Sequence, residues 1–329
     1  MEPIYPFSTP LGQGIWAVDT GYQRPNFDAA YLIVEQGRAA FIDCGTSHSV
    51  PRLLAALDAT GVPRDAVDWV IPTHVHLDHA GGAGALMAAL PSARLVVHPR
   101  GARHLISPDA LLAGARAVYG EAEVQRAYGT VVPVAADRVT ESSDGLVIRL
   151  AGRPLRFLDT PGHARHHHCI WDERSRGFFT GDTFGLSYRE FDTSAGIWLL
   201  PTTTPVQFDP AALRTSVERL LAEVPACMYL THYGRVPVIG SENPSDVQQL
   251  GRELLEQLDE VVALCGQAAG LGLPARERHA FLRDGLSALY LQRVAQLECQ
   301  LQRKQILDML EMDIELNAQG LGVWMDAKR

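Results

Sequence analysis

The stretch THVHLDHAGG, residues 73–82, constrains the fold more than any other part of this 329-residue chain. It places three histidines and an aspartate within six positions, directly behind the apolar run 69–71 and just before two glycines. At this spacing, charged imidazole rings repel one another, and so do carboxylates. A divalent cation bound between them stabilises the cluster. The stretch therefore predicts a buried strand that ends at a metal site.

The spacing inside this stretch can serve two ions. In an extended segment, residues two apart point to the same side, so His74 and His76 can hold one ion. Asp78 and His79 fall where the chain begins to curl toward a helix, and they can point at a second ion beside the first. The glycines that follow let the backbone pass close to the site.

Three further stretches, DTPGHARHHH, FFTGDTFG and MYLTHYG, place a metal-ligand residue just past a predicted buried strand, with a glycine nearby. Strand ends at one edge of a sheet converge, and α/β sheets carry their sites there. Four segments meeting at one edge would supply five histidines and two aspartates. The additional candidates are His163 after strand 155–159, Asp182 after strand 178–180 and His232 after strand 228–230.

The remaining apolar patterns predict an α/β chain with helices packed on a sheet. A helical insertion is expected at about residues 100–128, inside a catalytic domain that spans 1–240. The other predicted elements are a hairpin at 29–43, helices at 50–60, 82–90 and 209–223, strands at 94–98, 131–134 and 146–150, and a hairpin at 167–180.

Beyond residue 240 the composition shifts to Leu, Gln, Glu and Arg at helical spacing, which predicts an α-helical module over 241–329. An apolar stripe along this module is expected to be core or a dimer face, and we expect a homodimer formed through these helices. The stripe consists of Leu286, Leu289, Val294, Leu297, Leu301, Ile306 and Leu310.

Charge and cysteine content limit the function classes. The net charge of −9 disfavours a nucleic-acid groove, which needs surplus Lys and Arg. No stretch reaches the apolar length of a membrane span, and the first residues lack the pattern of a signal peptide, so a cytoplasmic protein is expected. The five cysteines form no CxxC pair and predict reduced thiols. Cys44 is expected to be a buried small side chain, with a catalytic thiol as the alternative.

Taken together, these motifs resemble those of the metallo-β-lactamase superfamily over roughly residues 10–240. The resemblance implies an αββα sandwich with a two-metal site at one edge. Asp43, in the stretch FIDCG, matches an acidic residue that supports the ligand loop from behind. The resemblance assigns one ion to His74, His76 and His163, the other to Asp78, His79 and His232, and the bridge to Asp182.

The implied activity is two-metal hydrolysis, in which a hydroxide bridging the ions attacks a small or medium ester, thioester or lactone. Asp78 is the candidate catalytic residue, because it would orient the water and handle its proton. Two divalent ions are expected as cofactors. Zinc is the first expectation, and iron or manganese would also suit a His/Asp ligand set.

Within the superfamily, the zinc β-lactamases do not use a bridging aspartate, so Asp182 disfavours antibiotic hydrolysis. Glyoxalase II-like thioesterases and lactonases share the HxHxDH motif, and His167 matches a later histidine of theirs, although the turn before it differs and no clear glutathione-binding set is present. The alternative is an iron-dependent oxidoreductase that resembles persulfide dioxygenases or diiron flavoproteins. A metal-binding protein without catalysis is a third possibility.

Several residues near these motifs carry open interpretations. His167 is expected to orient a ligand from behind, with His166 and His168 as surface or core histidines. Tyr233 can donate a hydrogen bond to an oxyanion, or it can serve packing alone. The irregular segment 184–205 holds Tyr188, Phe191 and Trp198 and is expected to form a substrate wall, with the 100–128 insertion and the C-terminal helices on the other side.

Overall fold

The computed structural model describes residues 7–203, 206–237 and 244–328. Contacts divide the chain into two compact units, each built from separate stretches of sequence. The first unit comprises residues up to Asp159, with His166–Gly181 and Ala226–Glu242. The second comprises Thr160–Arg165, Asp182–Pro225 and Asn243–Arg329. The predicted division at residue 240 into a catalytic domain and a helical module stays a prediction.

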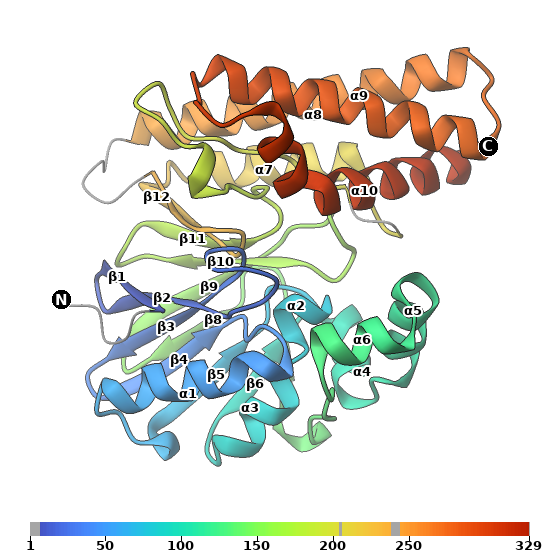
Figure 1. Cartoon of the computed structure of the whole chain (residues 1–329). Helices are drawn as coiled ribbons and strands as arrows, with labels where there is room; N and C mark the ends of the chain where they lie inside the picture. Colours follow the sequence, from blue (N-terminus) through green and yellow to red (C-terminus); the bar gives the residue numbers. More distant parts are fainter. Residues whose placement is uncertain (1–6, 204–205, 238–243, 329) are drawn as a thin grey trace. The chain divides into compact units, whose positions relative to one another are not determined.

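The first unit contains two mixed sheets (Figure 1). In the seven-stranded sheet the strands follow in sequence order, antiparallel from β1 to β4 and parallel from β4 to β7. The predicted hairpin at 29–43 is confirmed as β3 and β4. The strands are β1 (Ser8–Gly12), β2 (Ile15–Asp19), β3 (Ala29–Glu35), β4 (Arg38–Ile42), β5 (Val67–Ile71), β6 (Arg94–Val97) and β7 (Val139–Glu141).

The second, six-stranded sheet has the order β13-β12-β11-β10-β9-β8. Only β11 and β12 pair in parallel; the other neighbours are antiparallel. This parallel pair brings the ends of two motif-bearing strands to the same edge. The strands are β8 (Val147–Leu150), β9 (Arg153–Asp159), β10 (His168–Asp172), β11 (Gly177–Gly181), β12 (Cys227–Leu230) and β13 (Gly234–Val236).

Successive side chains along each strand point to opposite faces of its sheet, and this explains how the first unit packs its sheets and helices in layers. One buried cluster joins inward side chains of both sheets, including Tyr31, Phe157 and Phe179, and so forms the core between the sheets. A second cluster joins the other face of the seven-stranded sheet to helices, for example through Leu53 and Leu86. The helices of this unit are α1 (Val50–Ala59), α2 (Leu77–Ala80), α3 (Ala83–Ala89), α4 (Pro99–Ile106), α5 (Asp109–Tyr119) and α6 (Glu121–Tyr128).

The helical insertion predicted at 100–128 is confirmed as α4, α5 and α6. The strand predicted at 131–134 is wrong, because these residues form no strand. Pro133 lacks the N–H group that a ladder requires, and the Val134 N–H bonds instead to the Leu105 carbonyl of α4. Short 3-10 turns occur at Ser47–Ser49, Arg64–Ala66, Ala136–Arg138 and Arg189–Phe191.

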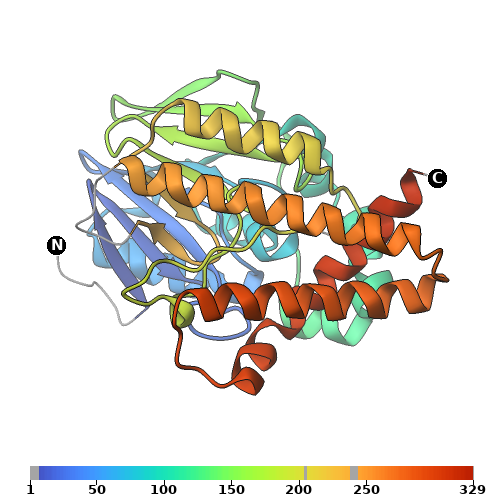
Figure 2. The same ribbon diagram turned by 90° about the horizontal axis from the view of Figure 1, so that it is seen from above.

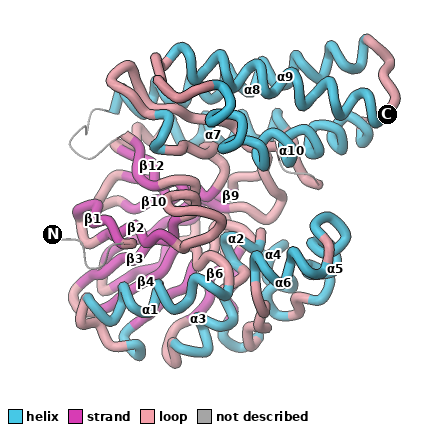
Figure 3. The backbone as a smooth tube through the Cα atoms, viewed as in Figure 1, coloured by secondary structure: helices cyan, strands magenta, loops and turns pink. Residues whose placement is uncertain are grey.

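The second unit is helical, and Figure 2 shows its long helices. Its elements are α7 (Pro210–Ala222), α8 (Pro244–Gly270), α9 (Ala275–Gln296) and α10 (Arg303–Ala327), coloured as helix in Figure 3. Most of the predicted apolar stripe, including Leu286, Val294 and Leu310, is buried within this single chain. The stripe is therefore core, and the homodimer stays a prediction.

The aromatic residues of segment 184–205 correct one expectation. Tyr188, Phe191 and Trp198 are fully buried and pack on one another, with Tyr188 and Trp198 stacked at 5.7 Å between ring centroids. These three side chains are core of the second unit and cannot form a solvent-facing wall. Irregular backbone misled the prediction, because aromatic residues can order a loop from inside as well as line a cleft. No helix in the described ranges has the length and apolarity needed to cross a membrane.

Candidate metal centre

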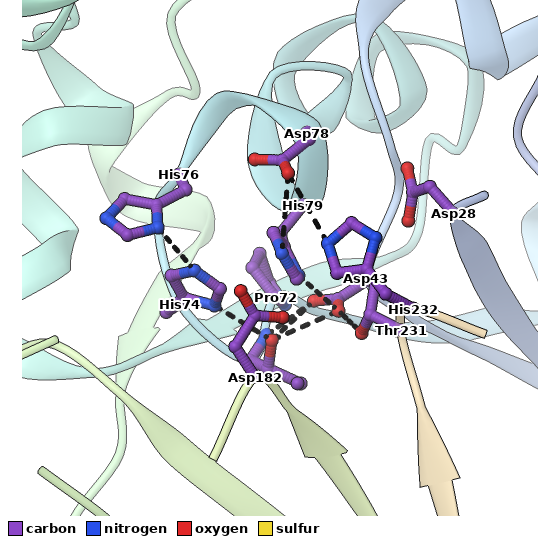
Figure 4. Close-up of polar contacts among 12 residues, drawn as sticks. Asp28, Asp43, Pro72, His74, His76, Asp78, His79, Asp182, Thr231 and His232 are labelled. Atoms are coloured by element: carbon purple, nitrogen blue, oxygen red, sulfur yellow. Dashed lines mark hydrogen bonds and ion pairs between the residues drawn. The ribbon is translucent and has the colours of Figure 1, made fainter. Parts of the chain in front are cut away.

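The first ligand stretch leaves β5 and turns into α2, which begins at Leu77 with His76 in the capping position. His74 is fully buried, and its Nε2 atom lies 2.8 Å from Nδ1 of His76 (Figure 4). The His74 Nδ1 atom contacts the Thr73 hydroxyl at 3.2 Å. Thr73 in turn donates to Asp43, so His74 Nδ1 carries the proton and Nε2 presents its lone pair.

A second group joins Asp78, His79 and His232, whose candidate ligand atoms all lie within 4.8 Å of one another. Asp78 Oδ2 is 3.8 Å from His79 Nε2 and 3.6 Å from His232 Nε2. The structure thus brings the end of β12 to the start of α2, and Figure 4 shows the three side chains facing one another.

In both histidines of this group, the Nδ1 atom, which points away from Asp78, has a hydrogen-bond acceptor. His79 Nδ1 lies 2.9 Å from Asp43 Oδ2, and His232 Nδ1 lies 2.9 Å from the Phe27 carbonyl. Ionised carboxylates and carbonyls only accept hydrogen bonds, so both protons are on Nδ1 and both Nε2 lone pairs face Asp78. Two lone pairs turned toward a carboxylate form a donor set that fits a divalent cation.

Asp43 organises this arrangement from the end of β4. Its carboxylate accepts from Thr73 N at 2.7 Å, Thr73 Oγ1 at 3.0 Å and Thr231 Oγ1 at 2.7 Å, besides His79. Its backbone has a φ of 53°, a left-handed conformation that is strained for a residue with a Cβ atom. These contacts tie β4, the residues after β5 and the residues after β12 to one buried carboxylate.

The second unit contains a pair of the predicted ligands. His163 Nε2 lies 3.2 Å from Asp182 Oδ2, and His163 Nδ1 lies 2.7 Å from the Thr202 hydroxyl. The Thr202 hydroxyl also lies 3.5 Å from the Asp182 carbonyl, so by donating there it can accept the Nδ1–H of His163, which leaves the Nε2 lone pair facing a carboxylate oxygen. That approach is favourable only with a proton or a cation between the two atoms. The pair therefore also fits a cation.

The three consecutive histidines after this motif all lie in the first unit and are all buried. The His167 ring stacks on His74 at 4.9 Å, and the His166 ring lies 5.5 Å from His76. His168 bonds to the Ser142 hydroxyl at 2.8 Å and to the Pro72 carbonyl at 2.9 Å. Burial lowers the pKa of His168 to about 3, so this ring is neutral and supports the backbone just before Thr73.

Two other candidates occupy packed positions. Tyr233 is partly buried against the cluster between the sheets, which is the packing alternative that the sequence left open. Cys44 is fully buried, its Sγ lies 3.2 Å from the His79 carbonyl, and burial raises the pKa of its thiol well above the usual value. A thiol in this environment resists ionisation, so Cys44 is a small core side chain and not a nucleophile.

Sequence reasoning missed the threonines and Asp28. Thr73 and Thr231 directly precede ligand histidines, and Thr160 opens the stretch that ends at His163, so a recurrent threonine was the available signal. Asp28 had none. Burial raises the pKa of its carboxyl to about 7, against the opposing influence of His232 and His79.

The comparisons with known proteins agree with this geometry. Residues 24–232 match the family described as the metallo-beta-lactamase superfamily. The chain is 26% identical to the metallo-beta-lactamase fold-containing protein ST1585 of Sulfurisphaera tokodaii, over 78% of this chain and 91% of that protein. The crystal structure of ST1585 covers 94% of this chain and 98% of its own, with a TM-score of 0.62 at 23% identity, and so shows the same fold.

Two enzymes are also among the relatives. The chain is 31% identical to the acyl-coenzyme A thioesterase MBLAC2 of Gallus gallus, over 53% of this chain and 64% of that protein. It is 27% identical to a hydroxyacylglutathione hydrolase of Aeromonas hydrophila, over 60% of this chain and 57% of that protein. The two sheets with their helices, the buried His/Asp groups and the match over residues 24–232 lead to one conclusion: this chain belongs to the metallo-beta-lactamase superfamily.

Proposed function

We propose that this chain is a binuclear metal-dependent hydrolase that cleaves the thioester bond of a small or medium acyl compound, with esters and lactones as related substrates. One ion would be held by His74, His76 and His163. The other would be held by Asp78, His79 and His232, with Asp182 bridging. Zinc is our first expectation for both ions.

The observation that carries the proposal is the direction of the imidazole lone pairs. Both His79 and His232 have Nδ1 committed to an acceptor behind the ring, and both turn Nε2 toward the Asp78 carboxylate. Histidines that only support the fold commonly use both nitrogens, as His168 does with Ser142 and Pro72. This orientation supports a cation held between the two rings and the Asp78 carboxylate.

The chain itself supports the inclusion of the pair from the second unit. Asp182 is covalently joined to Gly181, the last residue of β11, and His163 follows Asp159, the last residue of β9, by four positions. An extended residue spans at most about 3.6 Å, so both ligands are tethered close to the ends of those strands. Gly162, at a φ of 135°, permits the turn that carries His163.

Divalent ions, when bound, lower the pKa of water and polarise an acyl carbonyl. The chain's own residues supply the rest. Asp78 is only partly buried and faces the lone pairs of two ligands, so its carboxylate can accept the proton of the attacking water. Asp43 fixes the tautomer of His79 and the position of Thr73, and so keeps the ligands in place through the reaction.

The thioester assignment has support from chemistry and from relatives. A thiolate is a better leaving group than an alkoxide, so no separate acid is required to protonate it. One relative is named for the hydrolysis of acyl-coenzyme A and another for the hydrolysis of hydroxyacylglutathione. Both names describe an acyl group released from a thiol carrier, and we extend that reaction class to this chain.

The first test is the metal content per chain, by plasma mass spectrometry, of protein purified without chelator or added metal. We expect about two equivalents of zinc or manganese, followed by thiol release from short acyl thioesters in a thiol-reactive dye assay. About one equivalent of iron, with oxygen consumption in place of thiol release, would favour the iron-dependent oxidoreductase instead. A folded sample without metal would contradict the proposal.

The second test is the substitution Asp182→Ala. Loss of the bridging carboxylate should remove several kcal/mol of transition-state stabilisation, about 1,000-fold in kcat/KM, together with one equivalent of metal. Asp192→Ala is the matched control, because Asp192 is a partly buried carboxylate of the same unit that pairs with Arg189. If Asp182→Ala retains both activity and metal, our assignment of the bridge is wrong.

A further inference from the structure

Asp28 lies directly before β3 and is held beside the segment that carries His232. The carbonyl of its neighbour Phe27 accepts from His232 Nδ1 at 2.9 Å, and the N–H of Ala29 donates to the Thr231 carbonyl at 2.8 Å. Asp28 is therefore fixed between two contacts to the ligand-bearing chain. Figure 4 shows its carboxyl group near the imidazole ring of His232.

The two oxygens of the Asp28 carboxyl group differ in their hydrogen bonding. The residue is fully buried, and Oδ2 accepts a hydrogen bond from the Thr20 hydroxyl at 2.9 Å. Within the described ranges, the buried Oδ1 atom has no hydrogen-bond partner. A buried carboxylate oxygen without a donor is costly and calls for a specific explanation, such as a role at a site or an ordered ligand.

The surroundings of Asp28 point to the metal centre. Its carboxylate interacts electrostatically with His232, His79 and Asp78, the three residues of the second ligand group. Asp28 is not a member of that group, whose ligand atoms lie within 4.8 Å of one another. Asp28 therefore lies outside the direct ligand set, and any hydrogen bond from it to that set passes through an intermediate molecule such as water.

A purely structural role explains these contacts less well. Anchoring Thr20 needs only one neutral acceptor, which an amide would provide without burying a charge. Asp19, the last residue of β2, lies opposite Ala29 in the sheet and shows how a nearby structural carboxylate is held. Its oxygens accept from the Gly21 N–H at 2.9 Å and pair with Arg52 at 3.5 Å. Asp28 has no such cation among the described residues, and the ligand group provides a place for one.

We propose that Asp28 is a positioning residue of the centre formed by Asp78, His79 and His232. Its carboxylate offsets the charge of the ion held there, and Oδ1 accepts a hydrogen bond from a water molecule that completes the ligand set of that ion. This inference rests on the proposed function, because it requires the site to bind metal.

The test compares Asp28→Asn and Asp28→Ala with the wild-type chain, using Zn²⁺ as the probe. Zinc affinity is measured by competition with a chromophoric chelator, and melting temperatures are measured for metal-free and zinc-loaded protein. We expect both variants to bind one of two zinc ions about 10- to 100-fold more weakly, as is typical when a partner behind a ligand is removed. The metal-free variants should melt at or above the wild-type temperature, because a buried charge has been removed.

Asp19→Asn is the matched control, because Asp19 is a buried aspartate at the end of β2 that faces Arg52. It should lower the melting temperature with and without zinc and leave zinc affinity unchanged. If the Asp28 variants behave like this control, Asp28 is structural and our inference is overturned. A wild-type chain that binds no zinc would overturn the proposed function itself, whereas two tightly bound zinc ions in wild type and variants alike would overturn only the role of Asp28.

Discussion

Each of the two units buries a cluster of polar side chains, and the clusters differ in where their hydrogen bonds lead. In the first unit, hydrogen bonds run outward from the ligand histidines to supports such as Asp43 and Phe27. In the second unit, the polar groups around Tyr188 and Asn317 bond to one another. Tyr188 donates to Asp313 at 3.1 Å, and Asn317 links the Thr203 backbone at 2.7 Å to the Tyr290 hydroxyl at 2.8 Å.

This difference separates a site from a scaffold. Both clusters are deeply buried, so burial alone does not identify a functional centre. The cluster of the second unit joins residues 188–203 to α9 and α10. The cluster of the first unit turns ring nitrogens of His79 and His232 toward the Asp78 carboxylate, an arrangement that fits a cation. Direction of the lone pairs, rather than polarity, is the informative feature.

Removal of the helices after residue 240 is the strongest test of the scaffold interpretation. A chain truncated there loses Asp313, Asn317 and Tyr290, together with the cover of the buried rings of Tyr188 and Trp198. We expect it to be insoluble or unfolded by circular dichroism. A soluble, cooperatively melting 1–240 chain that binds zinc would show instead that the predicted domain boundary is real.

The second prediction compares the substitution Asp43→Ala in the first unit with a substitution in the polar cluster of the second unit. Several buried donors, including Thr73 and Thr231, lose their acceptor together, so we expect a loss of about 3–5 kcal/mol in the free energy of unfolding. Metal affinity should also fall about 10- to 100-fold. Asp313→Ala in the second unit is the counterpart, and it should lower stability without changing zinc binding. Equal effects of both substitutions on zinc binding would break the distinction between site and scaffold.

The pH dependence of stability tests the support beneath the ligand stretch. Burial lowers the pKa of His168 to about 3, whereas an unfolded histidine titrates near 6.5. Below pH 6.5 the unfolded chain binds a proton that the folded chain does not. Stability from this residue is therefore complete above pH 6.5 and falls by about 1.4 kcal/mol per unit as the pH drops toward 3.

Urea unfolding of the metal-free protein at pH 6.5 and pH 5 would measure this effect. His168→Gln should reduce the difference in unfolding free energy between these pH values by about 2 kcal/mol. An unchanged difference would mean that His168 is protonated in the folded chain.

The smallest expected effect concerns a single hydrogen bond of the scaffold cluster. Tyr188→Phe removes the hydroxyl that donates to Asp313 and leaves the ring stacked on Trp198. We expect a loss of about 1 kcal/mol by chemical denaturation, with zinc affinity and thioester hydrolysis unchanged. A change in KM would return residues 184–203 to a substrate-binding role, against which the burial of Tyr188, Phe191 and Trp198 argues.

Sequence predicted the parts of the molecule in which one short pattern carries the physical cause. The hairpin at 29–43, helix α1 and the strands before the ligand motifs follow from local periodicity and turns. The strand at 131–134 failed because Pro133 cannot join a ladder, and β7 forms a few residues later at Val139–Glu141. The aromatic rings of segment 184–205 were misassigned because their cover comes from helices about 100 residues away in the sequence.

For the candidate site, whose metal ligands stay a prediction, the sequence pointed to residues more readily than to their partners. The ligand-type residues could be named because each follows a strand, but their partners could not. Asp28 resembles any polar residue before a strand, and its contact with the His232 segment depends on pairing across roughly 200 positions. Asp43, by contrast, was found through its resemblance to a family motif, and the structure shows the hydrogen bonds that such a role requires.

The ligand group of the first unit draws on residues that are far apart in the chain. Asp78 and His79 come from its first stretch, and His232, roughly 150 residues later, comes from its last. An ion bound by all three would hold the two ends of this long segment together in the folded chain only, so its binding free energy would add to the free energy of unfolding. Metal supply would then govern how much of this protein survives in the folded form, before any substrate is met.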